Sequence, residues 1–584
     1  MISRRVALEE LTSAEFDVVV IGGGVTGAGV ALDAASRGYS TAIVERADWA
    51  IGTSSRSSKM VHGGLRYLQN FDLGLVREAL LERQLLVQLA PHLVYPTPFL
   101  VPTLRDERVD RKIGIGLNMY DVMATTRVGS ARRERRGAAA ADRWAPDRHR
   151  TIDGPEVVER IPALADRDPK SAYLFYDCQT DDVRLVLTIL GEAERYGAVM
   201  LNGAEVTDLL EVGGRAAGVR CREAESGEEF EVRATNVVNA TGVFADQIRP
   251  DEIHDEAEIP RIAPSRGTHI LLGLDKLAIG ENACVVPAGA GRAIFVLPWY
   301  GRALVGTTDN DFDGDIVHPA PAEADIEYLL DALNAFFGTS LGGGDICGAY
   351  AGVRPLISTG DPKKSVDISR KAELYETSSG LITITGGKLT TWRRMAKDVV
   401  DRIVEREDAE APCRTADLPL GMVAQPQDLI PDGDLAVEDL PDRTTDLLAF
   451  RYGHAARNVL AVATGDRAMA APIVAGMPDI LAEVVIAARD EQARSVADLL
   501  LRRTRLGILA APELRSAAAV APIAAALGGE LGWSQTRIRA EAERWPAEMA
   551  REGVDPAGAV RSGVDTCDDQ AVAAGPRPGT SERT

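Results

Sequence analysis

The chain has 584 residues, which is too many for one hydrophobic core, so its length predicts several domains, roughly three or four. It is 45% hydrophobic and 26% charged, with a mean hydropathy of -0.07, which excludes a fibrous, low-complexity or integral-membrane protein. The net charge of -22 argues against broad electrostatic capture of nucleic acid, so we expect no nucleic-acid partner.

The cysteines and the N-terminal segment predict neither a metal site nor secretion. The six cysteines contain no CxxC pair, and none lies near a histidine at metal-ligand spacing, so we expect no disulfide scaffold and no metal ligands. The first residues carry acidic side chains where a signal peptide needs an apolar stretch. No apolar run approaches the roughly 20 residues that span a bilayer, although such a chain can still lie on a membrane surface.

The N-terminal part of the chain predicts a βαβ unit followed by a further helix. The β-branched run 16–21 is expected to form a buried parallel strand, residues 25–37 a helix, and residues 40–45 a second buried strand. The Leu-rich stretch 75–90 stops before Pro91, which predicts a helix packed on this unit.

The turn of this unit carries a nucleotide-binding pattern. Gly22, Gly24 and Gly27 form G-x-G-x-x-G directly after the first strand, and Glu45 ends the second strand. The glycines let the backbone approach a pyrophosphate at the positive end of a helix, and the acid can accept hydrogen bonds from a ribose. The combination predicts a dinucleotide site; a glycine-rich turn in an ordinary parallel sheet is the alternative.

The segment after the second strand favours FAD over NAD. Residues 52–59 (GTSSRSSK) and 62–67 (HGGLRY) place small hydroxyl residues and glycines beside the proposed ribose site, although a flexible surface loop is the alternative. Further glycine segments at 239–246 and 386–393 fit the same elongated ligand. The expected cofactor contacts in these segments are Thr53, Ser54, Ser58, Lys59, His62, Gly63, Gly64, Gly242, Gly387, Leu389 and Thr390.

The rest of the chain predicts a second sheet and a helical region. The Arg- and Ala-rich stretch 126–150 is predicted to be a solvated loop, and residues 205–233 an antiparallel hairpin outside the parallel sheet. Residues 262–384 are expected to form a mostly antiparallel sheet over a binding cleft. Helices are predicted at 444–465, 477–489, 495–509 and 535–551.

Motifs along nearly the whole chain resemble those of one enzyme family. They are GGGVTGAG (22–29), SSRSSKMVHGGLRYL (54–68), GTHI (267–270), GTTD (306–309), GVRPL (352–356), GGKLTTWR (386–393) and, in the helical region, LLRRTRLG (500–507). In this order they resemble the FAD-dependent, quinone-linked glycerol-3-phosphate dehydrogenases, within the wider group of flavin enzymes similar to amino-acid oxidases. Each motif alone could be accidental, whereas the ordered set is specific.

The resemblance implies an α/β fold in which a Rossmann-like FAD-binding domain is interleaved with a mostly antiparallel substrate (cap) domain, followed by an all-α domain. The expected boundaries are 1–75, 155–260 and 350–412 for the FAD-binding domain, 76–154 and 261–349 for the cap, 413–441 for a linker, 442–553 for the helical domain and 554–584 for a disordered tail.

The resemblance also implies a substrate pocket, formed by Arg66, Tyr67, His269, Asp309, Arg354, Arg370 and Lys388. A phosphate dianion needs two or three cations, preferably arginines because their fork fits phosphate oxygens. Convergence of Arg66, Arg354, Arg370 and Lys388 would supply them in an acidic chain. Each arginine taken singly is more often part of a surface ion pair.

The implied reaction is oxidation of sn-glycerol 3-phosphate to dihydroxyacetone phosphate by hydride transfer to flavin N5, with electrons passed to a membrane quinone. It needs a base for the C2 hydroxyl proton and cations beside the alkoxide. We rank His269 as the base and Arg354 with Lys388 as stabilisers. Arg354 is the alternative base, and an isolated His269 would more often be a core histidine.

Residues 111–123 combine two cations with large apolar residues. Such a helix can bury an apolar face among acyl chains while its cations meet anionic lipid, and a helix buried in the protein fits the pattern equally well. Resemblance to peripheral membrane enzymes favours the membrane interface and implies a cytoplasmic location on the inner face of the plasma membrane.

Other interpretations are weighed beside this one. An oxidase of the same fold would pass electrons to oxygen, and a flavin-binding sensor or scaffold at the membrane would catalyse nothing. Residues 309–314 imitate a calcium loop, but Ala320 stands where the bidentate acid is needed, which argues against calcium. The quinone site, the role of the helical domain, for which we prefer a structural one, and the oligomeric state, with a homodimer among the alternatives, are left open.

Overall fold

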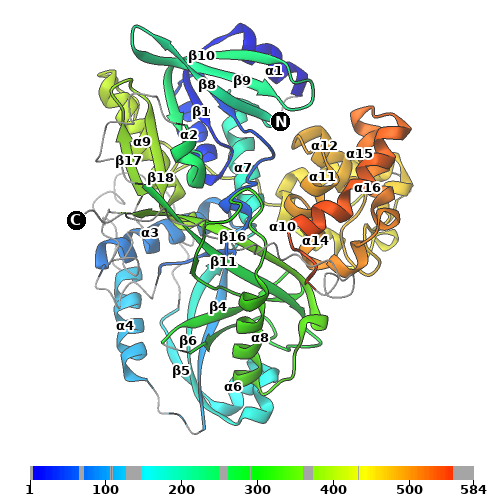
Figure 1. The fold of residues 1–584 in the computed structure, drawn as a ribbon. Helices are drawn as coiled ribbons and strands as arrows, with labels where there is room; N and C mark the ends of the chain where they lie inside the picture. Colours follow the sequence, from blue (N-terminus) through cyan, green and yellow to red (C-terminus); the bar gives the residue numbers. More distant parts are fainter. Residues whose placement is uncertain are drawn as a thin grey trace, which may run out of the picture.

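The computed structural model describes residues 4–64, 72–105, 107, 110–125, 147–248, 261–289, 291–358, 372–431, 433 and 435–556. Two sheets lie one above the other, and a helical domain coloured yellow to red lies beside both of them (Figure 1). Most of the predicted loop at 126–150 falls outside the described residues.

The first sheet has the strand order β17-β18-β10-β1-β2-β7, in which β18, β10, β1, β2 and β7 are parallel and β17 pairs antiparallel with β18. Its strands are β1 (Glu15–Ile21), β2 (Thr41–Val44), β7 (Val199–Leu201), β10 (Glu229–Asn239), β17 (Ala372–Glu376) and β18 (Ile382–Gly386). Alternate side chains of a strand point to opposite faces, so Val18 and Val20 enter one core while Val19 and Ile21 enter another. Because both faces are covered, β1 is apolar throughout most of its length.

Helices on one face and a helix with a hairpin on the other cover this sheet. The first core contains residues of α2 (Val25–Ser36), α3 (Leu73–Leu89), α7 (Asp182–Arg195) and α9 (Trp392–Arg406). The second contains residues of α1 (Arg4–Ser13) and of the hairpin β8 (Ala204–Val212) and β9 (Arg215–Glu223). The prediction that this hairpin lies outside the parallel sheet is wrong, because β9 pairs with the first half of β10.

The second sheet is mostly antiparallel, in the order β15-β11-β14-β13-β12-β4-β6-β3, with β16 on β11 and β5 on β6. Its strands are β3 (Met60–Val61), β4 (Tyr95–Leu104), β5 (Arg150–Asp153), β6 (Pro169–Gln179), β11 (Arg261–Gly273), β12 (Ala283–Pro287), β13 (Ala293–Trp299), β14 (Arg302–Gly306), β15 (Asn310–Asp311) and β16 (Ile346–Ser358). α6 (Gly154–Arg160) and α8 (Glu323–Phe337) pack against one face.

Two strands lie in a different sheet from the one that their expected domain implied. β6 falls within 155–260, which was assigned to the FAD-binding domain, yet it pairs with β4 over ten residue pairs. β16 extends into 350–412 and pairs along β11 of the second sheet. Both corrections have one cause: a local pattern predicts a strand, but the pairing partner is set by contacts far along the chain.

The helical domain contains α10 (Thr444–Tyr452), α11 (Ala456–Gly465), α12 (Ala482–Asp490), α13 (Val496–Arg502), α14 (Leu506–Leu509), α15 (Ala517–Leu531) and α16 (Gln535–Arg551). Gly453, with a φ of 52°, divides the helix predicted at 444–465. Helix α15 was not among the predicted helices, because its Ala-rich pattern contains a proline and two glycines.

The expected linker and the start of the expected tail are packed against the fold. Leu418 and Leu420 of the 413–441 segment join the core of the first sheet. Val554 is buried and its carbonyl accepts a hydrogen bond from the Ala349 amide, at 2.9 Å. The first residues of the 554–584 segment are therefore ordered, in contrast to the expected disorder, and residues 557–584 lie outside the described part of the chain.

Candidate active site

A cavity of about 1500 Å³ is lined by residues of both sheets. Its walls include the glycine turn after β1, the segment 51–58, and the turn between β18 and α9. Strands β11 and β16 of the second sheet contribute His269 and Arg354 to the opposite wall, and α4 (Arg111–Thr125) contributes apolar side chains.

The glycine turn has the geometry of a phosphate cradle. Gly22 has a φ of 108°, and a Cβ atom on Gly27 would lie 1.9 Å from the carbonyl oxygen of Gly22. α2 begins directly after Gly24, so its amide groups and positive dipole end face this turn. The turn therefore fits the pyrophosphate of a dinucleotide.

Glu45 supports the turn in addition to lining the cavity. Its carboxylate accepts hydrogen bonds from the Gly23 amide at 2.7 Å and the Ala47 amide at 3.0 Å. Burial raises the pKa of Glu45, and the two amide donors oppose that rise. An adjacent residue that the sequence analysis missed, Arg46, also lines the cavity and lies over the Phe244 ring, 3.9 Å from its centroid.

Most of the expected cofactor residues line the cavity. They are Gly22, Gly24, Glu45, Thr53, Ser54, Ser58, His62, Gly64, Gly242, Gly387, Leu389 and Thr390. Gly27 does not line the cavity. It lies against Gly22, and a side chain at position 27 would collide with the carbonyl of that residue. The elements that meet at the cavity are thus those that carry the glycine motifs.

Two expected cofactor residues point elsewhere. The Lys59 ammonium is fully buried and donates to the Ser55 carbonyl and to both carboxylate oxygens of Asp182. The Gly63 amide donates to the hydroxyl of Tyr120 on α4, at 2.9 Å. Neither residue lines the cavity, and both make the structural contacts described above, so their contacts with the cofactor stay a prediction.

His269 and Arg354 come together because β11 and β16 are neighbours. The register of these strands pairs Ser265 with Arg354 and His269 with Tyr350. Gly306 on β14 lies beside the imidazole, where a Cβ atom would be only 2.2 Å from Cδ2 of His269. The lack of a side chain at Gly306 therefore leaves space for the imidazole in the sheet.

The environment of His269 keeps its imidazole neutral. Nε2 lies 2.8 Å from Oγ of Ser58, and Nδ1 has no hydrogen-bond partner among the described residues. Burial lowers the pKa of His269 well below its usual range, and the charges of Lys59 and Arg354 lower it further. A neutral imidazole is able to accept a proton.

The guanidinium of Arg354 is held by the GTTD segment. It donates to Asp309 Oδ1 at 3.0 Å, to Thr307 Oγ1 at 3.2 Å and to the Thr308 carbonyl at 3.1 Å. Thr307 and Thr308 were not among the expected site residues. These contacts orient the planar fork, which remains partly exposed to the cavity.

The described residues include half of the expected cation cluster. Arg354 and Lys388 both line the cavity, and Lys388 precedes the turn that leads into α9. Arg66, Tyr67 and Arg370 lie outside the described residues. Their part in the substrate pocket stays a prediction.

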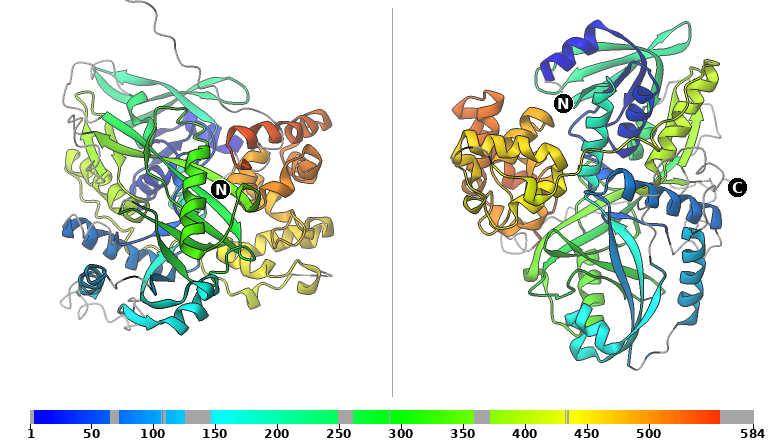
Figure 2. Two further views of the ribbon diagram at one scale, coloured as in Figure 1. Left: turned by 60° about the horizontal axis from the view of Figure 1, so that its bottom comes forward. Right: turned by 180° about the vertical axis from the view of Figure 1, so that it is seen from behind.

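α4 lies on the side of the molecule opposite the helical domain (Figures 1 and 2). Ile115, Met119 and Val122 follow helical spacing on one face and are 62%, 37% and 63% exposed, whereas Tyr120 is buried.

No helix in the described ranges is long and apolar enough to cross a membrane.

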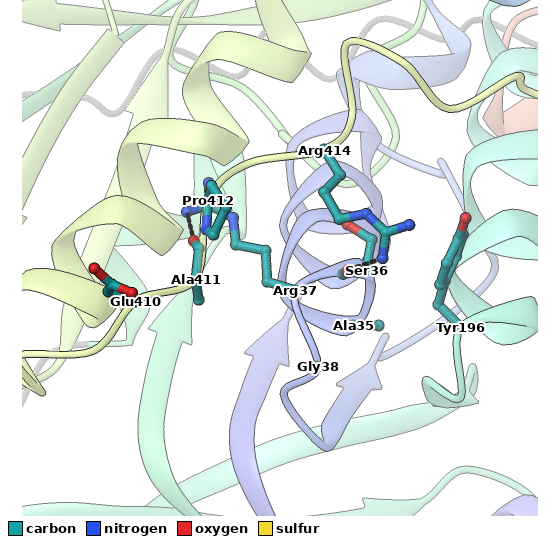
Figure 3. Close-up of a pocket in the computed structure, with 9 residues that line it drawn as sticks. All are labelled: Ala35, Ser36, Arg37, Gly38, Tyr196, Glu410, Ala411, Pro412 and Arg414. Carbon is teal, nitrogen blue, oxygen red and sulfur yellow. Dashed lines mark hydrogen bonds between the residues drawn. The ribbon is translucent and has the colours of Figure 1, made fainter.

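A second hollow of about 360 Å³ lies at the carboxyl end of α2, away from the glycine turn (Figure 3). Arg37 donates there to the Ala411 carbonyl at 3.0 Å, and Arg414 to the Ser36 carbonyl at 3.1 Å. Both guanidinium groups are engaged with the backbone, at the negative end of the helix dipole. We therefore assign no ligand to this hollow.

Comparison with known proteins gives the class of the protein. The family profile described as "FAD dependent oxidoreductase" matches residues 17–397, and that described as "C-terminal domain of alpha-glycerophosphate oxidase" matches residues 382–538. The solved structure of a glycerol-3-phosphate dehydrogenase from Bacillus halodurans complexed with FAD is similar, with a TM-score of 0.72 and 26% identity, over 94% of this chain and 98% of its own. The fold is that of an FAD-dependent oxidoreductase.

Curated relatives narrow this class. Glycerol-3-phosphate dehydrogenase 2 of Mycobacterium tuberculosis is 37% identical over 94% of this chain and 90% of its own length. The mitochondrial glycerol-3-phosphate dehydrogenase of Rattus norvegicus is 37% identical over 91% of this chain and 72% of its own. The chain belongs to the family of FAD-dependent glycerol-3-phosphate dehydrogenases.

Proposed function

We propose that this enzyme oxidises sn-glycerol 3-phosphate to dihydroxyacetone phosphate and passes the electrons to a membrane quinone. The observation that carries the proposal is the convergence of His269, Arg354 and Lys388 on the cavity that also contains the glycine turn. The names of the relatives support the same substrate.

The cations of the cavity select an anionic substrate. Arg354 presents an oriented fork and Lys388 a second charge, so that together they attract the phosphate and stabilise negative charge on the C2 oxygen. We expect Arg66 and Arg370 to complete the phosphate site. The whole chain is acidic, so this local charge would concentrate the substrate at the cavity.

His269 takes the proton of the C2 hydroxyl. The Ser58 hydroxyl lines the cavity and lies 2.8 Å from Nε2, so it can take that proton from the substrate as it gives its own to this nitrogen. FAD, when bound along the glycine segments, supplies the acceptor for the hydride from C2. Burial of His269 keeps the base neutral before the substrate arrives.

An apolar part of the cavity supports a lipid-soluble electron acceptor. Phe99, Phe175 and Phe295 of the second sheet line it together with Ile113 and Met119 of α4. A quinone with an apolar tail could enter through such a wall.

The exposed face of α4 supports attachment to a membrane surface. Ile115 and Val122 would insert among lipid acyl chains, while Arg111 and Lys112 at the start of the helix would meet anionic headgroups. On this proposal the protein acts at the inner face of the plasma membrane, where its quinone resides.

The choice of acceptor is tested by steady-state turnover of the FAD-loaded enzyme with glycerol 3-phosphate. We expect fast turnover with a short-chain quinone and little hydrogen peroxide when oxygen is the sole acceptor. The second candidate is an oxidase that uses oxygen, which the description of the C-terminal profile favours. Peroxide formation as fast as quinone reduction would establish that candidate instead.

A further inference from the structure

Buried arginines of the LLRRTRLG segment join the helical domain to the part of the chain that borders the active-site cavity. Arg502 and Arg503 donate to the carboxylate of Asp48, and Arg505 donates to Asp181 and Asp182. The Arg505 side chain is 1% exposed. These ion pairs join parts of the chain that are more than 300 residues apart.

Arg505 and Lys59 hold the same carboxylate and the same carbonyl. The Lys59 ammonium lies 3.0 and 2.8 Å from the two carboxylate oxygens of Asp182, and Arg505 donates to Oδ1 of that carboxylate. Both cations also face the Ser55 carbonyl, Lys59 at 2.6 Å and Arg505 at 3.4 Å. Two cations thus balance the carboxylates of Asp181 and Asp182 in a site closed to solvent.

Asp182 transmits this restraint to the segment beside the cavity. Its Oδ2 accepts from the Ser57 amide at 3.1 Å and from the Ser57 hydroxyl at 2.7 Å. Tyr350 donates to the Ser57 carbonyl at 2.7 Å, so both backbone polar groups of Ser57 are held. The next residue, Ser58, lies 2.8 Å from the imidazole of His269.

We propose that Arg505 is a positioning residue for the oxidation: from the helical domain it holds Asp182, and through Ser57 it sets the place of the Ser58 hydroxyl that orients His269. The inference rests on the proposed function of His269. It gives the helical domain a task in catalysis, in addition to the structural role expected from the sequence. Arg505 contacts neither substrate nor cofactor on this account.

A lysine at position 505 is expected to replace the charge without replacing the contacts. The guanidinium donates at once to Asp181, Asp182, Ser55 and the Leu501 carbonyl, whereas an ammonium is a point charge with fewer donors. Ser57 and Ser58 would then be less well held, and the imidazole less well oriented. Misplacement of a reacting group on this scale costs about tenfold to a hundredfold in rate.

The test is anaerobic stopped-flow reduction of the FAD-loaded enzyme by glycerol 3-phosphate. We expect Arg505→Lys to lower the limiting rate about tenfold while FAD content and the apparent substrate Kd stay unchanged. The matched control is Arg184→Lys, a buried arginine that pairs with Glu491 of the same helical domain but does not contact the segment 53–59. It should leave the limiting rate unchanged.

A double-mutant cycle separates positioning from general stability. Ser58→Ala removes the hydroxyl on which Arg505 is proposed to act, so Arg505→Lys should cause no further loss of limiting rate in that background. Independent, multiplying losses would overturn the inference. If Arg505→Lys lowers FAD content, the cycle is repeated with Asp182→Asn in place of Arg505→Lys. Losses of limiting rate that multiply between Asp182→Asn and Ser58→Ala would also overturn the inference.

Failure of the proposed function would look different. If glycerol 3-phosphate does not reduce the flavin of the unaltered enzyme, the proposed function fails before any variant is compared. If it reduces the unaltered enzyme and all variants at one rate, the function stands and only the role of Arg505 is overturned.

Discussion

The imidazole of His269 stacks on the ring of Tyr350, with ring centroids 4.7 Å apart and planes inclined by 9°. The two residues are opposite each other on the antiparallel strands β11 and β16. Tyr350 also donates to the Ser57 carbonyl, next to the Ser58 hydroxyl that meets His269. Tyr350 therefore packs against the face of the His269 ring, and Ser58 holds its Nε2 atom.

The pH dependence of flavin reduction should follow the charge near His269. The neutral imidazole is the active form, so the rate falls as pH drops through its pKa, which Lys59 helps to lower. Lys59→Met removes that charge and should move the acid limb to higher pH, whereas Lys59→Arg should leave it in place. Titration of the substrate phosphate is common to all variants. An acid limb that does not move in Lys59→Met would contradict this assignment.

Lys388→Ala should slow flavin reduction while FAD stays bound. The ammonium is proposed to stabilise negative charge on the substrate, and removal of one such group costs about a hundredfold to a thousandfold in rate. The matched control is Lys397→Ala on α9, whose ammonium pairs with Asp401 on the surface of the helix. Stopped-flow rates and the flavin absorbance of the purified variants provide the measurement. Loss of the yellow cofactor from Lys388→Ala would show that the lysine belongs to the FAD site.

Gly27→Ala should abolish FAD binding. The new methyl group would lie 1.9 Å from the Gly22 carbonyl, so the turn would have to open and its amides would leave the pyrophosphate site. Gly191→Ala on α7 is the control, since a Cβ atom there has nothing within 4 Å. The flavin-to-protein ratio after purification, with circular dichroism as a check of folding, decides the matter. A Gly27→Ala variant with full flavin content would contradict the assignment of the glycine turn as the pyrophosphate site.

Val122→Asp should weaken binding to anionic lipid vesicles by about tenfold, because it removes an apolar side chain and adds a charge that repels the headgroups. Val122 is 63% exposed and does not line the cavity. Val212→Asp, at a position 73% exposed on the β8 strand, is the control for loss of any exposed valine. Co-sedimentation with vesicles measures the effect. Equal binding of both variants would mean that another face meets the membrane.

The sequence predicts the parts of this structure that local patterns encode. β1, α2 and β2 follow one another within a short stretch, so their apolar runs and the glycines at 22, 24 and 27 were enough to predict the unit. The approach of His269 to Arg354 was implied only by the family resemblance, since periodicity says nothing about which strands are neighbours.

The rest depends on contacts between distant parts of the chain. Lys59 lies in a motif that suggested the cofactor, but its partner is Asp182, 123 residues further on. Residues far apart in the chain also meet where β6 pairs with β4 and where Arg505 forms an ion pair with Asp182. Such contacts are selected by the packing of whole domains, and a single sequence carries no local signal for them.

The most direct test of the account is the flavin spectrum of the FAD-loaded enzyme under anaerobic conditions, before and after addition of glycerol 3-phosphate. We predict that the oxidised flavin band bleaches, that bleaching saturates with substrate, and that glycerol without phosphate leaves the band unchanged. A spectrum that glycerol 3-phosphate does not alter would contradict the proposal that His269, Arg354 and Lys388 form the active site for this substrate.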